Sequence, residues 1–248
     1  MEMEPLYSRI QQTALRGFGR INRSDEVLHR RWEVEAGTWD VRVVRGDVLE
    51  KATTTRIRIA ARHPVTGVHT RFDVCQVKAY PRNPGVPVLL VNVENRTAGD
   101  DVFAGFLDVA PVAASGDDLD RLRTVMRAVC EQHGQDYGLL SSRIADIYRL
   151  DNRDKALNAG LGIRLEFPAE RVDLVREASL QWIEAYCSLV EKIKSEPADE
   201  MQQEVLNRCR AGICAFYMLR DVSFKSALAM GVPLEALTLG NFPPAVTF

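Results

Sequence analysis

Alternating apolar and polar positions run through much of the chain and predict a β-sheet. The alternating segments are rich in β-branched residues, and polar or Pro-containing turns separate several of them, which is typical of strands. The predicted strands are 38–44, 53–61, 71–80, 86–95, 101–110, 161–167 and 212–219. Because short turns join most of the consecutive strands, we expect an antiparallel sheet of about seven strands.

A different pattern, in which apolar residues recur every three or four positions, predicts helices near the start and in the second half of the chain. Within 5–20, this spacing relates Leu6, Ile10, Ala14 and Phe18. The other predicted helices are 24–35, with a cap at Ser24-Asp25-Glu26, and 117–134, 169–195 and 199–210. Strands and helices segregated in this way predict an α+β fold with helices packed on the sheet. The chain has no repeat or linker, so we expect a single domain over residues 1–248.

The composition is that of an ordinary globular protein, with 46% hydrophobic and 27% charged residues. The net charge of −2 gives no field that would attract nucleic acid or an anionic membrane, and no apolar run has the ~18 residues of a membrane span. The five cysteines show no metal-ligand spacing, and an odd number without a secretory leader is typical of reduced thiols. We therefore expect a cytoplasmic protein that binds neither nucleic acid nor membrane.

Common catalytic and cofactor motifs are absent from the sequence. It contains no GxGxxG segment, P-loop, HExxH pair or nucleophile elbow. The four histidines, His29, His63, His69 and His133, have no ligand spacing. We expect that no metal is bound and that the function depends on another kind of site.

More specific motifs occur in a fixed order between residues 31 and 244. They are Arg31-Trp32-Glu33 with 48–52 (VLEKA), 80–87 (YPRNPGVP), Asn92, 103–111 (FAGFLDVAP), 153–156 (RDKA) with Gly160, Asp221 and 241–244 (NFPP). They resemble, in the same order, the motifs RWE…VFEKAG, HPRNPxxP, HxNxR, FGGGxDLTP, RNEARGVGG, YDRGT and SLPP of the oxygen-dependent coproporphyrinogen III oxidases. One such motif is common by chance, whereas the ordered series indicates a divergent member of that family.

The resemblance implies a coproporphyrinogen-oxidase-like fold, with helices on both faces of a large antiparallel sheet, and a homodimer. Members of the family convert propionate side chains of a porphyrinogen to vinyl groups with molecular oxygen as co-substrate, and they need neither a redox metal nor an organic cofactor. Such chemistry requires an electron-rich ring, and a carboxylate near the ring N–H groups assists it. The matching carboxylate here is Asp108, the predicted catalytic residue. The alternative is a strand-end aspartate that accepts hydrogen bonds from a neighbouring turn.

The chain departs from the family at positions that grip carboxylates. Tyr80 and Leu90 replace two motif histidines, and Glu94 replaces the arginine of HxNxR. Two further arginines and a glutamate are replaced by Leu157, Leu234 and Ala236. Each lost bidentate contact costs about 1.5–3 kcal/mol. We therefore expect no tight binding of a tetracarboxylate porphyrinogen and no formation of protoporphyrinogen.

The retained and altered polar residues predict a different ligand. The predicted substrate-binding residues are Tyr80, Arg82, Asn92, Glu94 and Arg153. Arg82 can hold one carboxylate or lock the Pro-rich turn, and Glu94 can bind an ammonium group or lie at a solvated strand end. These residues favour a pyrrole- or indole-like carboxylate as the small-molecule substrate. We expect a cofactor-independent, oxygen-dependent oxidase of the oxidative decarboxylation type, in specialised metabolism rather than in haem synthesis.

Three alternatives stay open at this point. The chain could be a cofactor-free oxygenase or decarboxylase on the same fold, because a fold does not determine a reaction. It could also be a non-catalytic tetrapyrrole-binding protein or an authentic coproporphyrinogen III oxidase. Loss of CO2 and two hydrogens from a substrate would separate oxidative decarboxylation from oxygen insertion.

Overall fold

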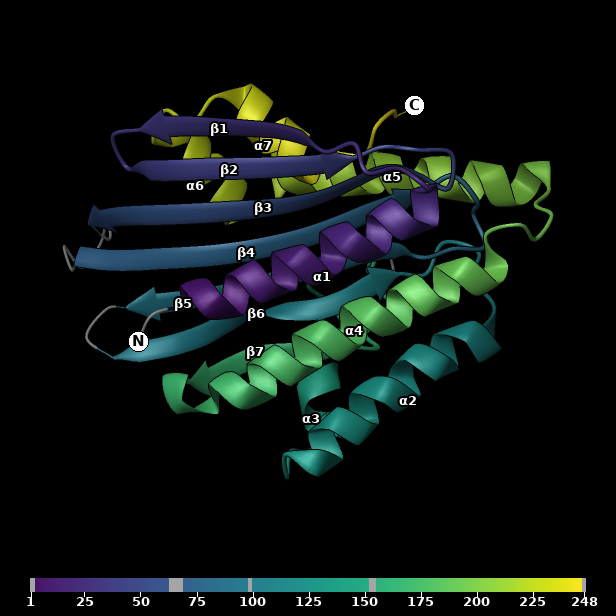
Figure 1. Ribbon diagram of the computed structural model, residues 1–248, viewed down its shortest axis with the longest axis horizontal. Coiled ribbons are helices and arrows are strands. Elements are labelled where there is room, and N and C mark those ends of the chain that lie inside the picture. The colour runs from purple at the N-terminus through teal and green to yellow at the C-terminus, as the bar shows by residue number, and fades with distance from the viewer. Residues whose placement is uncertain (1–2, 63–68, 98–99, 152–154, 247–248) are drawn as a thin grey trace.

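One antiparallel sheet forms the centre of the molecule (Figure 1). The computed structural model describes residues 3–62, 69–97, 100–151 and 155–246. The strands found in these ranges are β1 (Leu28–Val34), β2 (Gly37–Val44), β3 (Leu49–Arg62), β4 (His69–Pro81), β5 (Val88–Thr97), β6 (Asp101–Ala110) and β7 (Ile163–Pro168). Each strand pairs with its neighbours in sequence order. The predicted α+β fold with a large antiparallel sheet is confirmed.

The first six strands form a simple meander. Glu35 and Ala36 join β1 to β2, and the Pro-rich segment after Pro81 joins β4 to β5. The long connection from β6 to β7 contains α2 (Gly116–Gln132) and α3 (Tyr137–Ser142). Its last part returns to the end of β6, where Ala159 N donates to Val109 O at 2.8 Å. This return places the 158–162 segment beside Asp108.

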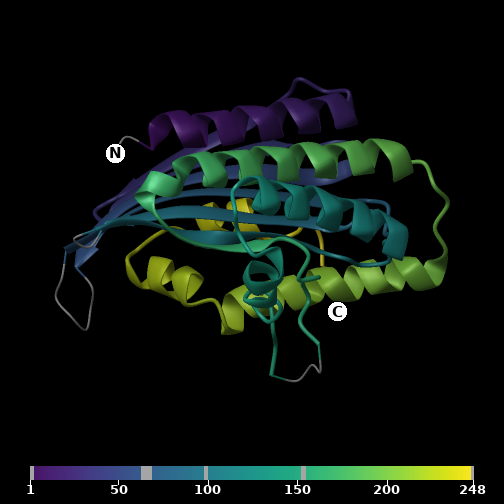
Figure 2. The same ribbon diagram turned by 90° about the horizontal axis from the view of Figure 1, so that it is seen from below.

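Helices cover the sheet in two layers, one on each face (Figure 2). On one face lie α1 (Glu4–Asn22), α2 and α4 (Val172–Ile193), and on the other lie α5 (Glu200–Leu219), α6 (Val222–Ala229) and α7 (Leu234–Asn241). We call these the α1/α4 face and the α5–α7 face. Each face has its own hydrophobic core, which contains Phe18 on the first and Tyr217 on the second.

The helix predicted over 24–35 is wrong, because Leu28–Val34 forms β1 instead. Ser24 caps only a turn, in which its Oγ accepts from Glu26 N at 3.2 Å. The two-residue turn at 35–36 then lets Leu28–Val34 pair with β2 along its whole length. Pairing with a neighbouring strand therefore decided the structure of this charged segment.

The strand predicted over 212–219 is also wrong, because these residues are the last two turns of α5. A capping box at Asp199 begins this helix. Leu206, Ile213 and Tyr217 are buried at helical spacing. A short apolar run cannot be assigned from periodicity alone. The predicted number of strands was right because one strand was missed and one was wrongly added.

Across the described ranges, none of the helices combines the length and the apolar character that crossing a membrane requires.

Candidate functional site

Four of the predicted site residues lie on the α5–α7 face of the sheet. The strand register pairs Leu90 with both Lys78 and Asp108, and it pairs Asn92 with Gln76 and Phe106. Cross-strand partners share a face of the sheet. Glu94 and Tyr80 follow on the same face, since side chains alternate along a strand. The family motifs from β4, β5 and β6 therefore converge on one surface, although they are far apart in sequence.

Asp108 is fully buried near the end of β6 and accepts four hydrogen bonds. Oδ2 accepts from Asn158 Nδ2 and Gly160 N, both at 2.8 Å, and Oδ1 accepts from Leu161 N at 3.0 Å and Gly162 N at 3.3 Å. Gly160 has a φ of +67°, a conformation that favours glycine. Burial raises the pKa of the Asp108 carboxyl, and the hydrogen bonds oppose that rise.

These four bonds occupy the acceptor positions of the Asp108 carboxylate. Asn158 extends the arrangement, because its Nδ2 also donates to Ile144 O at 2.7 Å and its Oδ1 accepts from Tyr148 N at 3.1 Å. In this structure Asp108 thus has the geometry of the alternative role, a carboxylate that holds a neighbouring turn. Its role as a base stays a prediction. That role would require the 158–162 segment to move, so that one carboxylate oxygen of Asp108 loses its hydrogen bonds and becomes available to a substrate.

The residues at the two positions where the family has histidine are inaccessible to a ligand in this structure. Tyr80 and Leu90 are fully buried, and both belong to the apolar core of the α5–α7 face. The Tyr80 hydroxyl donates to Asn241 O at the end of α7. Burial raises the pKa of Tyr80 well above its usual value, so the phenol stays neutral. The predicted substrate contact at Tyr80 therefore requires α7 to move.

Asn92 is half-buried in the middle of the same face, and its Oδ1 is buried without a hydrogen-bond partner in the described part of the chain. Its cross-strand neighbours, Gln76 and Phe106, are also half-buried. A buried acceptor without a donor costs free energy unless a ligand or water satisfies it. Of the predicted substrate-binding residues, Asn92 has the geometry that best fits a ligand contact.

Glu94 is not available as a solvated acid. It is 8% exposed, and its Oε1 lies 2.5 Å from Arg96 Nε. Arg96 follows two positions later on the same strand and face. The carboxylate that replaces the family arginine is thus neutralised by an adjacent guanidinium, and an ammonium ligand would have to compete with Arg96.

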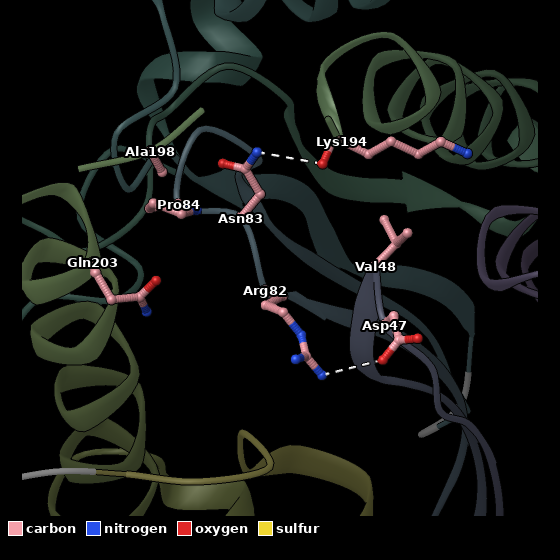
Figure 3. Close-up of a pocket in the computed structure, with 8 residues that line it drawn as sticks. All are labelled: Asp47, Val48, Arg82, Asn83, Pro84, Lys194, Ala198 and Gln203. Carbon is pink, nitrogen blue, oxygen red and sulfur yellow. Dashed lines mark hydrogen bonds and ion pairs between the residues drawn. The ribbon is translucent and has the colours of Figure 1, made fainter. Parts of the chain in front are cut away.

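Arg82 lies at a different place, at the rim of a cavity of about 250 Å³ between the Pro-rich turn and the start of α5 (Figure 3). Its guanidinium points toward Asp47, with Nη2 at 3.6 Å from Oδ1, and its Nε lies 3.9 Å from Glu50 Oε1. Glu50 in turn pairs with the buried Arg210 of α5. These ion pairs support the turn-locking alternative for Arg82.

Asn83 explains why the Pro-rich turn has its sequence. Its Oδ1 accepts from Gly85 N at 2.9 Å, and its Nδ2 donates to Glu196 O at 2.8 Å and to Lys194 O at 3.5 Å (Figure 3). One side chain thus stabilises the turn and binds the carbonyls that follow α4. The YPRNPGVP motif has a structural role here, separate from the face that carries Asn92.

Arg153, the last predicted substrate-binding residue, lies outside the described residues.

Two lysines on the α5–α7 face were missed as site candidates. Lys51 and Lys78 are 3% and 2% exposed, and burial is the main cause that lowers the pKa of each amine to about 7. A signal for Lys78 was present in the sequence. Gln76, Lys78 and Tyr80 alternate with Cys75, Val77 and Ala79, which places polar groups on one side of a central strand.

Aromatic rings of the helical layer lie beside Lys78. Tyr217 stacks on Phe242 at 6.0 Å between ring centroids, and Phe224 stacks on Phe242 at 5.5 Å. Lys78 Nζ lies 5.0 Å from the Tyr217 centroid. The Tyr148 and Tyr217 hydroxyls are hydrogen-bonded at 2.8 Å. The face thus combines buried amines, amides and aromatic rings, a composition suited to a flat ring with polar substituents.

Among the residues that the structure describes, no three His, Cys, Asp or Glu side chains are arranged to hold a metal ion. The expected absence of a metal or an organic cofactor stays a prediction.

Comparison with known proteins agrees with the motifs. The sequence model of the coproporphyrinogen III oxidase family matches residues 2–248. A curated relative, the oxygen-dependent coproporphyrinogen-III oxidase of Dictyostelium discoideum, is 25% identical over 201 residues. The match covers 76% of this chain and 58% of the relative, so the chain spans less than two thirds of the relative's length. Because the family match extends over nearly the whole sequence, this chain belongs to the coproporphyrinogen III oxidase family.

Proposed function

We propose that the chain is an oxygen-dependent oxidase of the oxidative decarboxylation type, acting on a pyrrole- or indole-like carboxylate that is smaller than coproporphyrinogen. The unpaired, buried Oδ1 of Asn92 is the observation that carries this proposal. A ring N–H of a pyrrole or an indole is the donor that this acceptor lacks. Family membership supports the reaction type, and the half-buried row of Gln76, Asn92 and Phe106 supports a ring as the ligand.

The reaction itself needs an electron-rich ring more than a reactive protein group. The substrate loses CO2 and two hydrogens from a propionate-like side chain, which becomes a vinyl group. Dioxygen takes up the two electrons and two protons and leaves as hydrogen peroxide. A hydrogen bond from the ring N–H to Asn92 Oδ1 would stabilise the positive charge that develops on the ring as electrons leave it.

The closed histidine positions support a substrate other than coproporphyrinogen. Tyr80 and Leu90 are packed in the core, and Glu94 places a carboxylate where the family has an arginine. A porphyrinogen with four carboxylates would meet fewer cationic partners on this face. A role in specialised metabolism rather than in haem synthesis follows from this difference in substrate.

The remaining parts of the proposal concern setting and assembly. We propose that the reaction uses no metal or organic cofactor, in line with the chemistry of the ring. A cytoplasmic location is supported by Cys75, Cys130, Cys187 and Cys214, which are buried and form no disulfide among the described residues. A homodimer is supported by β1, an edge strand whose outer hydrogen-bonding groups can pair with another chain.

The experiment that tests the function is incubation with candidate substrates with and without oxygen. Indole-3-propionate, a pyrrole propionate and coproporphyrinogen would be compared, with oxygen uptake and product mass as measurements. We expect oxygen-dependent loss of CO2 and two hydrogens from one of the smaller acids. Oxygen-dependent consumption of none of them would contradict the proposal, and gain of oxygen in the product would favour the oxygenase alternative.

One observation favours the non-catalytic binder as a second candidate, namely the saturated carboxylate of Asp108. Substitution of Asp108 by Asn would separate the two only if folding is measured as well. The amide would direct an N–H₂ group at main-chain N–H groups and weaken the 158–162 segment. In a binder, ligand affinity would fall in proportion to the folded fraction, whereas an enzyme would lose turnover in the folded protein.

A further inference from the structure

Two ammonium groups are buried next to one another without a counter-ion. Lys51 and Lys78 lie on β3 and β4, and both point to the α5–α7 face. The register pairs Lys51 with Tyr80 and Lys78 with Thr53, so the amines occupy neighbouring rows. Within the described ranges, neither amine has a carboxylate at ion-pair distance. This arrangement is unusual, because buried lysines are normally paired with an anion.

Neutral oxygens at the end of α7 take the place of a counter-ion. Lys51 Nζ donates to Thr238 O at 3.1 Å and to Phe242 O at 2.5 Å. Lys78 Nζ donates to Asn241 Oδ1 and, at 3.2 Å, to Gln76 Oε1. The last turn of α7 thus covers the two amines and satisfies their protons, but it does not neutralise their charge.

The charged groups around the two amines leave the pair positive. The positive charge of Arg45 lowers the pKa of Lys51, and that of Lys51 lowers the pKa of Lys78. Asp221 favours the charged form of Lys78 from the start of α6, beyond ion-pair distance. Burial is the largest cause that lowers the pKa of both amines to about 7. An anion between them would remove this penalty.

The amines are also placed where a ring acid would need them. Lys78 of β4 is the cross-strand neighbour of Leu90 of β5, and neighbouring strands lie about 4.8 Å apart. Asn92 follows Leu90 by two positions on the same face. The Tyr217 ring, 5.0 Å from Lys78 Nζ, provides an aromatic wall. Asn92 could accept a ring N–H while a side-chain carboxylate reaches the amines.

We propose that Lys78 and Lys51 bind the carboxylate of the substrate, in place of the arginines that this chain has lost. The inference rests on the proposed function, since it assigns the carboxylate site of the same substrate. The carboxylate displaces Asn241 Oδ1 and Phe242 O, because a charge-assisted hydrogen bond is stronger than one to a neutral acceptor. A helix of eight residues has little stability of its own. The end of α7 can therefore change its conformation and release these contacts when the anion binds.

Anaerobic calorimetric titration would test the carboxylate site without turnover. The probes are indole-3-propionate and 3-methylindole, which carry the same ring with and without a carboxylate. The proteins are the wild type, Lys78→Met, Lys51→Met and Lys225→Met, the last an exposed lysine of α6 as the matched control. We expect Lys78→Met to bind indole-3-propionate at least about tenfold more weakly, with 3-methylindole unaffected and the control unchanged.

Methionine preserves most of the lysine volume without its charge, so the variants are expected to fold. Asn241→Ala provides a test with the opposite sign. It removes the neutral acceptor that competes for Lys78, so indole-3-propionate should bind more tightly.

The proposal is overturned if wild type binds the acid no better than 3-methylindole, or if Lys78→Met keeps the wild-type affinity. The proposed function fails separately. Anaerobic binding that depends on Lys78, without oxygen uptake in air, would reject the oxidase and keep the carboxylate site. Turnover by Lys78→Met with the wild-type KM would reject the carboxylate site and keep the oxidase.

Discussion

The cations that β3 and β4 bury have different partners on the two faces of the sheet. On the α1/α4 face, the buried Arg56 pairs with Asp73 at 2.8 Å and lies over the Tyr7 ring at 4.0 Å. On the α5–α7 face, Lys51 and Lys78 are equally buried but have only neutral acceptors. In the first arrangement the cation has an anion of the same chain as its partner, although Arg56 Nη1 has no hydrogen-bond partner among the described residues. The second lacks an anion, which is typical of a binding site rather than of a core.

Polar atoms need a closer comparison, because both faces contain satisfied and unsatisfied ones. The Tyr7 hydroxyl on the α1/α4 face donates to Asp73 O at 2.9 Å. Among the described residues, Trp182 Nε1 on that face is buried without a partner, and so are Thr55 Oγ1 and Asn92 Oδ1 on the other face. Unsatisfied polar atoms are rare in folded proteins and each requires an explanation. Thr55 and Asn92 differ from Trp182 because they share a face with two buried lysines that have no counter-ion, and this combination favours the α5–α7 face as the binding face.

The largest expected effect comes from Asp108, the exception on the α5–α7 face, because its polar contacts are complete. Asp108→Ala would leave four buried donors without an acceptor. With each costing about 1–3 kcal/mol, the free energy of unfolding should fall by at least about 4 kcal/mol. Urea denaturation measures this, with Asp120→Ala, an exposed carboxylate of α2, as the control. A loss below about 1 kcal/mol would show that Asp108 is not the anchor of the 158–162 segment.

The next prediction compares one cation from each face. Arg56→Met would leave Asp73 buried and unpaired, which costs about 3–5 kcal/mol. Lys78→Met would remove a buried charge that has no counter-ion, which offsets the loss of its hydrogen bonds to Asn241 and Gln76, so the free energy of unfolding should change by less than about 1 kcal/mol. Denaturation of both variants at pH 7 measures the difference. Equal destabilisation by the two substitutions would abolish the distinction between the faces.

The pH dependence of stability should depend on the two lysines. Both have a pKa of about 7 in the folded protein and about 10.4 when unfolded, so the folded state binds fewer protons between these values. Stability therefore rises with pH in this window and is lost as pH falls toward 7. Between pH 7 and 9.5 the gain is about 3 kcal/mol per lysine, to order of magnitude.

Urea denaturation at both pH values would measure this gain for the wild type and for Lys51→Met/Lys78→Met. The double variant should lose most of the dependence, whereas Lys225→Met should retain it. A double variant with the wild-type slope would mean that the amines keep ordinary pKa values. Such a result would place them in contact with water or with an anion already bound.

The sequence was sufficient to predict most of the fold, because β2 to β6 alternate clearly and follow one another after only a few residues. It failed at β1, an edge strand with little burial and therefore little alternation. It failed again at 212–219, where an apolar run continues an amphipathic helix. In both cases a contact outside the segment decided the structure, either pairing with β2 or packing against the sheet.

The site was predicted less well than the fold, for a physical reason. Motif order identified the face that carries Asn92 and Asp108, because cross-strand register brings the motifs together. The state of Asp108 depends on Asn158 and the following main-chain N–H groups, about 50 residues later in sequence. The state of Lys78 depends on Asn241, at the other end of the chain. Such long-range partners cannot be inferred from local pattern.

The smallest expected effect on stability, with a large one on activity, concerns Asn92. Its Oδ1 has no partner to lose in the described structure, so Asn92→Leu should change the free energy of unfolding by less than about 1 kcal/mol. The same substitution removes the acceptor proposed for the ring N–H, so turnover should fall at least about tenfold. Gln181→Leu is the matched control, because Gln181 is a half-buried amide of α4 on the other side of the sheet and lies outside the proposed site. If Asn92→Leu unfolds the protein as readily as Arg56→Met does, Asn92 belongs to the structural network, and the α5–α7 face loses the acceptor proposed for the ring N–H.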